Sequence, residues 1–139
     1  MTPLGILGPV HLVAAVVGLS LLTASLIRLY RSEDGVPTRR LASAGGLFMA
    51  IPFALGWAMY PTYRTQIKPG LLTEHPGLVT AFESKEHLAA MGLCCVLGGV
   101  GALIAPEGLG AGRSLLTTGW MLCVIAAGIG VAVTWVPSL

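Results

Sequence analysis

Charged residues are scarce in this chain. Asp, Glu, Lys and Arg make up 10% of its 139 residues, whereas a soluble domain carries about 25%. Hydrophobic residues make up 55%, so the composition favours an integral membrane protein over a water-soluble domain. The net charge is only +2, and the chain has no basic arm and no stripe of alternating aromatic and basic residues. We therefore expect no nucleic-acid partner.

Cysteine is also rare. Cys94, Cys95 and Cys123 all lie inside apolar runs, which is not the pattern of a disulfide framework. We expect them to be small buried apolar side chains. The motif C-x-x-C-H is absent, and this excludes a covalently attached c-type haem.

The abundant feature is a set of four apolar runs, each about as long as the 20 residues that cross a bilayer core. They cover about residues 9–29, 41–60, 87–105 and 115–136. Backbone groups find no water partner in lipid, so each run is expected to be a helix. The predicted fold is all-α, an integral membrane four-helix bundle that forms a single transmembrane domain over residues 1–139.

Small residues within these runs predict close contacts between helices. The positions expected there are Ala42 with Gly46, Gly98 with Gly101, and Gly128.

The basic residues predict an orientation. Two short connections carry five arginines, whereas the long segment 61–86 carries three basic residues. The first group is Arg28, Arg31, Arg39, Arg40 and Arg113, and the second is Arg64, Lys68 and Lys85. The positive-inside rule then places the N and C termini and segment 61–86 on the non-cytoplasmic side. The expected location is the bacterial inner (cytoplasmic) membrane.

Segment 61–86 is the one sizeable polar stretch, and two interpretations of it remain open. Its prolines and glycines are typical of a solvated loop. Alternatively, the third helix starts near Gly77 and raises Glu83, Lys85 and Glu86 to the membrane surface.

Two histidines lie at matching depths in the predicted spans. His11 precedes Arg28 by 17 residues, or about 25 Å at 1.5 Å per residue. His87 precedes Pro106 by 19 residues, or about 28 Å by the same rise. Ionisable residues in a membrane span are candidates for function, and two imidazoles at one level can ligate one metal centre.

Haem b fits this pair best, with His11 and His87 as axial ligands of a low-spin iron. Mostly small residues follow both histidines at helical spacing and would admit the porphyrin. They are Ala14, Ala15 and Gly18 in one helix and Ala90, Met91 and Cys94 in the other. Arg64, Lys68 and Lys85 lie on the same side and are candidate partners of the propionates. Histidines at the edge of a span can also face lipid headgroups or bond a backbone carbonyl.

A non-haem metal site is the alternative. Glu83, Glu86 and His87 are spaced as neighbours on one helix face, and with His11 and His75 they would supply ligands for zinc, copper or iron. Lys85 between the two glutamates also fits a plain surface ion network.

With His11 and His87 in four spans, the chain resembles small four-helix membrane b-type cytochromes and haem-bearing membrane anchor subunits of quinone oxidoreductases. The resemblance implies an electron-transfer subunit that holds one haem b and passes electrons between a quinone and a partner protein. Tyr63, Glu74 and His75 are the candidate proton partners of that quinone. At this length, other membrane subunits or a homo-oligomer are expected as partners.

A cofactor-free structural or assembly subunit remains the alternative. A transporter is disfavoured, because no charged residue lies at a span midplane and no inverted repeat is evident.

Overall fold

The computed structural model describes the backbone of residues 3–134 and the side chains of residues 7–132. Within that range the chain is all-α and contains no β-strand. The elements in chain order are α1 (Pro3–Tyr30), α2 (Val36–Thr62), the π-helix η1 (Tyr63–Ile67), α3 (Lys68–Glu74), α4 (Pro76–Ile104) and α5 (Leu109–Thr134). Four helical stretches are long and apolar enough to cross a membrane, in agreement with the composition.

The helices extend past the apolar runs, because their ends are set by local backbone signals. Gly35 precedes α2, and Pro37 occupies its first turn, where a missing N–H costs nothing. Pro76 begins α4 in the same way. Ala105 is extended, with φ −71° and ψ 145°, as expected for a residue before proline. The predicted span 115–136 lies within α5 up to residue 134, and its last two residues lie outside the described range.

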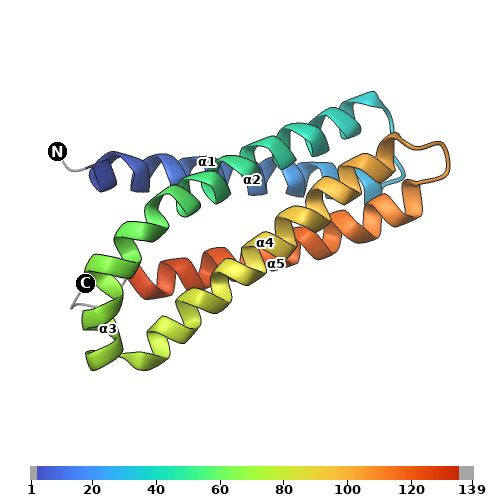
Figure 1. Ribbon diagram of the computed structural model, residues 1–139. Coiled ribbons are helices and arrows are strands. Elements are labelled where there is room, and N and C mark those ends of the chain that lie inside the picture. Colours follow the sequence, from blue (N-terminus) through green and yellow to red (C-terminus); the bar gives the residue numbers. More distant parts are fainter. Residues whose placement is uncertain (1–2, 135–139) are drawn as a thin grey trace.

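Segment 61–86 is helical throughout except at His75. Of the two interpretations, the helical start near Gly77 is the one observed, because α4 begins at Pro76. The preceding residues continue α2 through η1 into α3 as one helical stretch from Val36 to Glu74. In Figure 1 this stretch runs from the α1–α2 connection to the start of α4.

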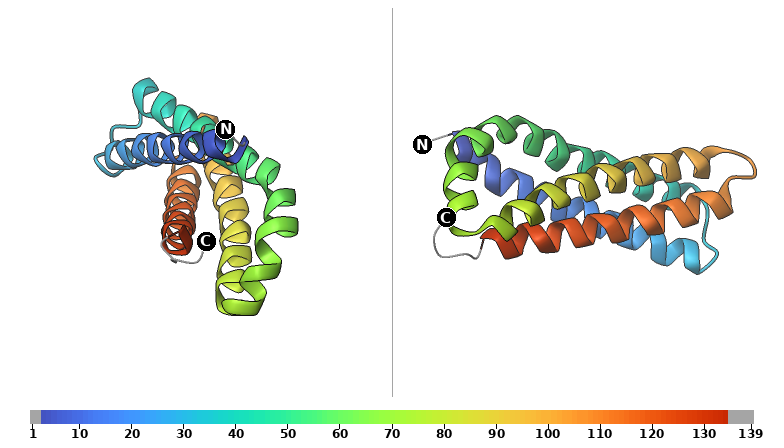
Figure 2. Two further views of the ribbon diagram at one scale, coloured as in Figure 1. Left: turned by 90° about the vertical axis from the view of Figure 1, so that its left-hand side faces the viewer. Right: turned by 60° about the horizontal axis from the view of Figure 1, so that its bottom comes forward.

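The four long helices form two antiparallel hairpins, α1 with α2 and α4 with α5 (Figure 1). Across the hairpins, α2 packs on α4 and α1 packs on α5, while no Cα atoms of α1 and α4 come within 8 Å of each other in the described residues. The hairpins lie close together where the two short connections meet. They separate toward the end that carries α3, as the views in Figure 2 show.

The main core lies nearer the end with the short connections. Its buried members come from all four long helices: Leu22, Leu26, Leu29, Ala42, Val96, Leu103 and Leu116. A second, smaller cluster of Tyr63, Leu71 and Val79 joins η1, α3 and α4 at the opposite end. The polar segment is therefore helical because its few apolar residues pack on one another.

Glycines in α4 and α5 bring these two helices into close contact. A methyl group added at Gly119 would lie 2.8 Å from the carbonyl oxygen of Gly92, and one at Gly99 would lie 2.9 Å from the Leu116 nitrogen. By contrast, Gly101 and Gly128 have nothing within 4 Å of an added methyl group. Close contact was predicted at Gly101 and Gly128, and this was wrong, because both face away from the neighbouring helix.

The prediction for Ala42 and Gly46 is confirmed, since both are buried. Ala42 has no exposed surface. A methyl group added at Gly46 would lie 3.4 Å from a Val96 methyl group, so Gly46 lies at the contact between α2 and α4.

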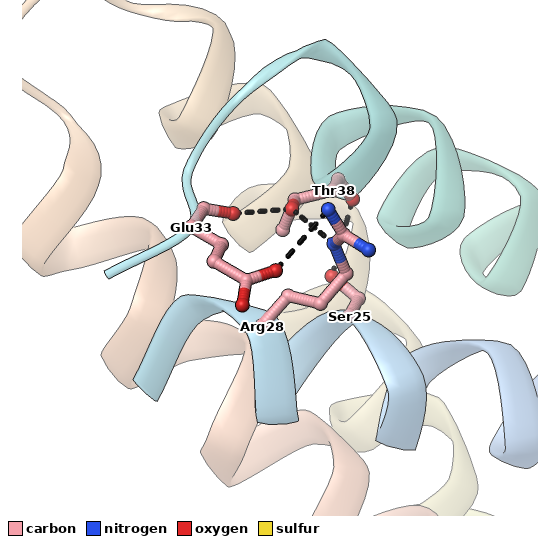
Figure 3. A network of polar contacts seen from close by, with 4 residues as sticks. All are labelled: Ser25, Arg28, Glu33 and Thr38. Carbon is pink, nitrogen blue, oxygen red and sulfur yellow. Dashed lines mark hydrogen bonds and ion pairs between the residues drawn. The ribbon is translucent and has the colours of Figure 1, made fainter. Parts of the chain in front are cut away.

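A buried polar network closes the α1–α2 connection (Figure 3). Arg28 Nε donates to Thr38 Oγ1 at 3.1 Å, and the Thr38 hydroxyl donates to the Glu33 carbonyl oxygen. Ser25 Oγ donates to the Thr38 carbonyl oxygen at 3.3 Å. Arg28 also pairs with the Glu33 carboxylate at 3.2 Å. Thr38 therefore takes part in every hydrogen bond of this network and links the end of α1 to the start of α2.

Replacing Thr38 by valine keeps the shape of this side chain and removes its hydroxyl. Arg28 Nε and the Glu33 carbonyl oxygen lose the hydroxyl as a partner, while Ser25 keeps its bond to the Thr38 carbonyl oxygen. Arg28 and Glu33 are partly exposed and can bind water instead, so we expect a loss of about 1 kcal/mol in the free energy of unfolding. Unfolding of the purified protein in detergent measures this loss. Thr118→Val, at an exposed position of α5, is the matched control and should leave the unfolding midpoint unchanged.

Candidate functional site

His11 is the histidine that faces the protein interior. It is half-buried on α1 and lies against α2, where a methyl group added at Gly56 would be 3.8 Å from His11 Cε1. Its Nδ1 is buried and has no hydrogen-bond partner. A buried polar atom without a partner normally costs stability, so this nitrogen marks a candidate ligand site, although the Pro52 carbonyl of α2 lies close enough to interact with the imidazole.

Lys85 extends from α4 toward the same region. Its side chain is half-buried, lies beside Gly130 of α5, and is within electrostatic range of His11. The ammonium group lies 4.2 Å from the centre of the Phe82 ring, a distance at which a cation and an aromatic face attract each other. The α4–α5 hairpin therefore supplies a cation near the α1 histidine.

Aromatic side chains continue this cluster toward η1. Phe82 stacks on Tyr63 with ring centres 4.1 Å apart. The Tyr63 hydroxyl is buried without a partner, so it is a second unpaired polar atom at this end of the protein. We define the outer polar cluster, named after the orientation that the basic residues predict, as His11, Tyr63, Phe82 and Lys85.

The other basic residues of this end are placed differently. Lys68 forms an ion pair with Glu83, which ties α3 to α4. Arg64 is exposed on η1 and lies within electrostatic range of the same carboxylate. Of the three predicted propionate partners, Lys85 is therefore the one that accompanies His11.

His87 points away from the protein. It is exposed, and its Nδ1 lies 2.8 Å from the Glu83 carbonyl oxygen one turn earlier. Met91 and Cys94, which follow on the same side of α4, are also exposed. Because His87 is exposed while His11 is half-buried, and the Cα atoms of α1 and α4 stay more than 8 Å apart in the described residues, the structure does not bring these two histidines together within one chain.

The small residues after His11 serve helix packing. Ala14 and Gly18 are buried, and a methyl group added at Gly18 would lie 2.8 Å from Met49 Sδ of α2. This face is therefore filled by the neighbouring helix.

The alternative non-haem metal site is not assembled. In residues 3–134, no group of three or more His, Cys, Asp or Glu side chains could hold a metal ion. His75 is exposed between α3 and α4, and Glu83 is paired with Lys68. Of the remaining two residues on α4, Glu86 is half-buried and His87 is exposed. The described arrangement therefore does not gather His11, His75, Glu83, Glu86 and His87 into one group, and a non-haem site formed by them stays a prediction.

The three residues predicted as proton partners of a quinone differ in burial. Tyr63 is buried within the outer polar cluster, while Glu74 and His75 are exposed. Two members of the cluster were not expected from the sequence as a pair, Phe82 and Tyr63. Their spacing of 19 residues carries no local signal, because the pair forms only when η1 folds back on α4.

No protein-family model, curated protein or solved structure matches this chain. Its class is therefore defined by the fold alone, an all-α chain with four helical stretches that are long and apolar enough to cross a membrane.

Proposed function

We propose that the chain is an integral membrane protein with four spans and with both termini on the non-cytoplasmic side. The support is the separation of the basic residues along the bundle. Arg28, Arg31, Arg39, Arg40 and Arg113 all lie at or next to the α1–α2 and α4–α5 connections, which share one end (Figure 1). The outer polar cluster is then on the outer side, and the bacterial inner membrane stays the predicted location.

We further propose that the chain is a membrane electron-transfer subunit that holds one haem b at its outer end, with His11 as an axial ligand. The observation that carries this proposal is the buried, unpartnered Nδ1 of His11. A neutral imidazole is a common axial ligand of haem iron, and Gly56 presents no side chain to the His11 ring, since a methyl group added there would lie 3.8 Å from Cε1.

The neighbouring residues fit the remaining needs of such a cofactor. Lys85 is the cation available to pair with a propionate. Phe82 and Tyr63 add aromatic surface beside it. When bound, the haem would supply one-electron chemistry, and the chain would hold it and exclude water.

The second axial position distinguishes two forms of the proposal. His87 Nδ1 donates to the Glu83 carbonyl oxygen within its own helix, which leaves Nε2 free, as in many metal-ligating histidines. It faces outward, however, so it would reach the same iron only after α4 turns or from a neighbouring copy. Without His87, the chain would supply only His11 to the haem iron.

The absorption spectrum of the purified protein, oxidised and reduced, tests the proposal. We expect a Soret band and a reduced α-band, and His11→Ala is expected to lose most of the bound haem because an axial bond is removed. If His87 is the second ligand, His87→Ala converts a low-spin spectrum to a high-spin one. His75→Ala is the matched control, because this exposed histidine should not affect the spectrum.

A colourless protein from cells that make haem would refute the haem proposal. A haem spectrum that survives in His11→Ala would refute the assignment of the ligand. An unchanged low-spin spectrum in His87→Ala would remove His87 from the site and leave His11 in place.

A cofactor-free structural or assembly subunit is the second candidate. The observation that favours it is the close helix packing after His11, where Ala14 is buried and Gly18 contacts Met49 of α2. In that case His11→Ala leaves the assembly and activity of the larger complex intact, whereas substitutions at the glycine contacts disrupt it.

A further inference from the structure

A pocket of about 430 Å³ lies between α1 and α5, near the end with the short connections. Its size falls within the range of about 300–1,000 Å³ that is typical of small-ligand pockets. The residues that line it are Thr23, Leu26, Ile27, Tyr30 and Arg31 of α1 and its C-terminal end, and Thr117 and Trp120 of α5.

The wall of this α1–α5 pocket presents mainly hydrocarbon, because its polar groups pair with one another. Trp120 Nε1 donates to Thr23 Oγ1 at 2.9 Å. The hydroxyl groups of Tyr30 and Thr117 are 3.2 Å apart. A ligand in the pocket is therefore expected to be apolar where it contacts this wall.

The mouth of the pocket is cationic. Arg31 lines it, and the Arg113 guanidinium lies 5.2 Å from the centre of the Tyr30 ring. Both arginines are exposed, and the ion pairs in the described part of the chain, Arg28 with Glu33 and Lys68 with Glu83, use neither of them. Guanidinium groups bind phosphate through paired hydrogen bonds, so the mouth complements an anionic phosphate next to an apolar wall.

We propose that the α1–α5 pocket binds an anionic phospholipid, with one acyl chain against Ile27 and Trp120 and the phosphate against Arg31 and Arg113. Basic pockets between membrane helices on the cytoplasmic side are known to take such headgroups. Tyr30 and Trp120 lie between the charged mouth and the apolar wall, where amphipathic rings prefer to be. This proposal rests on the four helices spanning a membrane and is independent of the haem proposal.

Fluorescence quenching by brominated lipids tests the site. Replacing Trp57 and Trp135 by phenylalanine leaves Trp120 as the one tryptophan of the chain. This protein is placed in phosphatidylcholine vesicles that contain a small fraction of either brominated phosphatidylglycerol or brominated phosphatidylcholine. We expect the anionic lipid to quench Trp120 at a lower fraction, and Arg31→Gln and Arg113→Gln each to reduce this preference about fivefold, which corresponds to about 1 kcal/mol per basic group.

Arg39→Gln with Arg40→Gln is the matched control, because it removes two exposed charges near the same end but outside the pocket. The preference should survive in this control. Ile27→Phe, which fills the pocket and keeps both arginines, should reduce quenching by the anionic lipid.

Equal quenching by the two lipids would overturn the site, as would an equal loss in the control. Competition by soluble glycerol phosphate would also overturn it, because a free phosphate would then suffice. Absence of quenching by either lipid would instead refute the membrane span itself, so the two failures are distinguishable.

Discussion

Gly119→Ala is expected to destabilise the protein by about 2 kcal/mol. The added methyl group would lie 2.8 Å from the Gly92 carbonyl oxygen and 2.8 Å from the Val96 nitrogen. These are backbone atoms of α4, so no side-chain rotation relieves the overlap and the two helices must separate. Overpacking costs about 1–3 kcal/mol, and overlap with backbone atoms places this change at about 3 kcal/mol. The gain of about 1 kcal/mol in helix propensity from glycine to alanine leaves a net loss of about 2 kcal/mol.

Gly128→Ala on the same helix is the control. Gly128 is exposed and has nothing within 4 Å of an added methyl group, so this change should leave stability equal or slightly higher. The free energy of unfolding in detergent measures both variants. Equal effects of the two substitutions would contradict the close contact between α4 and α5.

Leu22→Ala is expected to cost about 2 kcal/mol. Leu22 has no exposed surface and belongs to the main core. In soluble proteins such a change costs about 2–5 kcal/mol, part of it from transfer of the side chain out of water. In a bilayer that part is small because lipid is as apolar as leucine, so the loss of packing dominates and the lower end of the range applies.

The partner of Leu22 gives this prediction a sharper form. A methyl group added at Gly45 would lie 2.8 Å from Leu22 Cγ, so Gly45→Ala alone overpacks the α1–α2 contact. In the double variant the new methyl group occupies space that leucine has left. We expect the double variant to be more stable than the sum of the single effects by about 0.5–3 kcal/mol, and strict additivity would argue against direct contact.

The number of helices could be predicted from the sequence, because a run of about 20 apolar residues has few alternatives to a helix in lipid. Most of their ends could not, although a start of the third long helix near Gly77 was one of two expectations and α4 begins at Pro76. Residues 61–86 are polar, and their helical state depends on tertiary contacts of Tyr63, Leu71 and Val79. No local sequence pattern in that segment predicts these contacts.

Position along a helix was easier to predict than direction around it. A rise of 1.5 Å per residue fixes depth, which is why His11 and His87 could be compared. Direction is decided by which face meets a neighbour, and four helices that are apolar on all sides give little signal of it. The same gap explains why Gly101 was chosen where Gly99, two residues earlier, makes the contact.

The π-helix η1 has a consequence for how α3 reaches α4. A π-turn holds one residue more than an α-turn, so Tyr63–Ile67 is equivalent to an α-helix that has absorbed a single-residue insertion. Everything after Ile67 is thereby turned by about 100° relative to an uninterrupted helix. That rotation sets the side of α3 from which Lys68 meets Glu83, so the ion pair and the burial of Leu71 depend on the phase of the helix as well as on its composition.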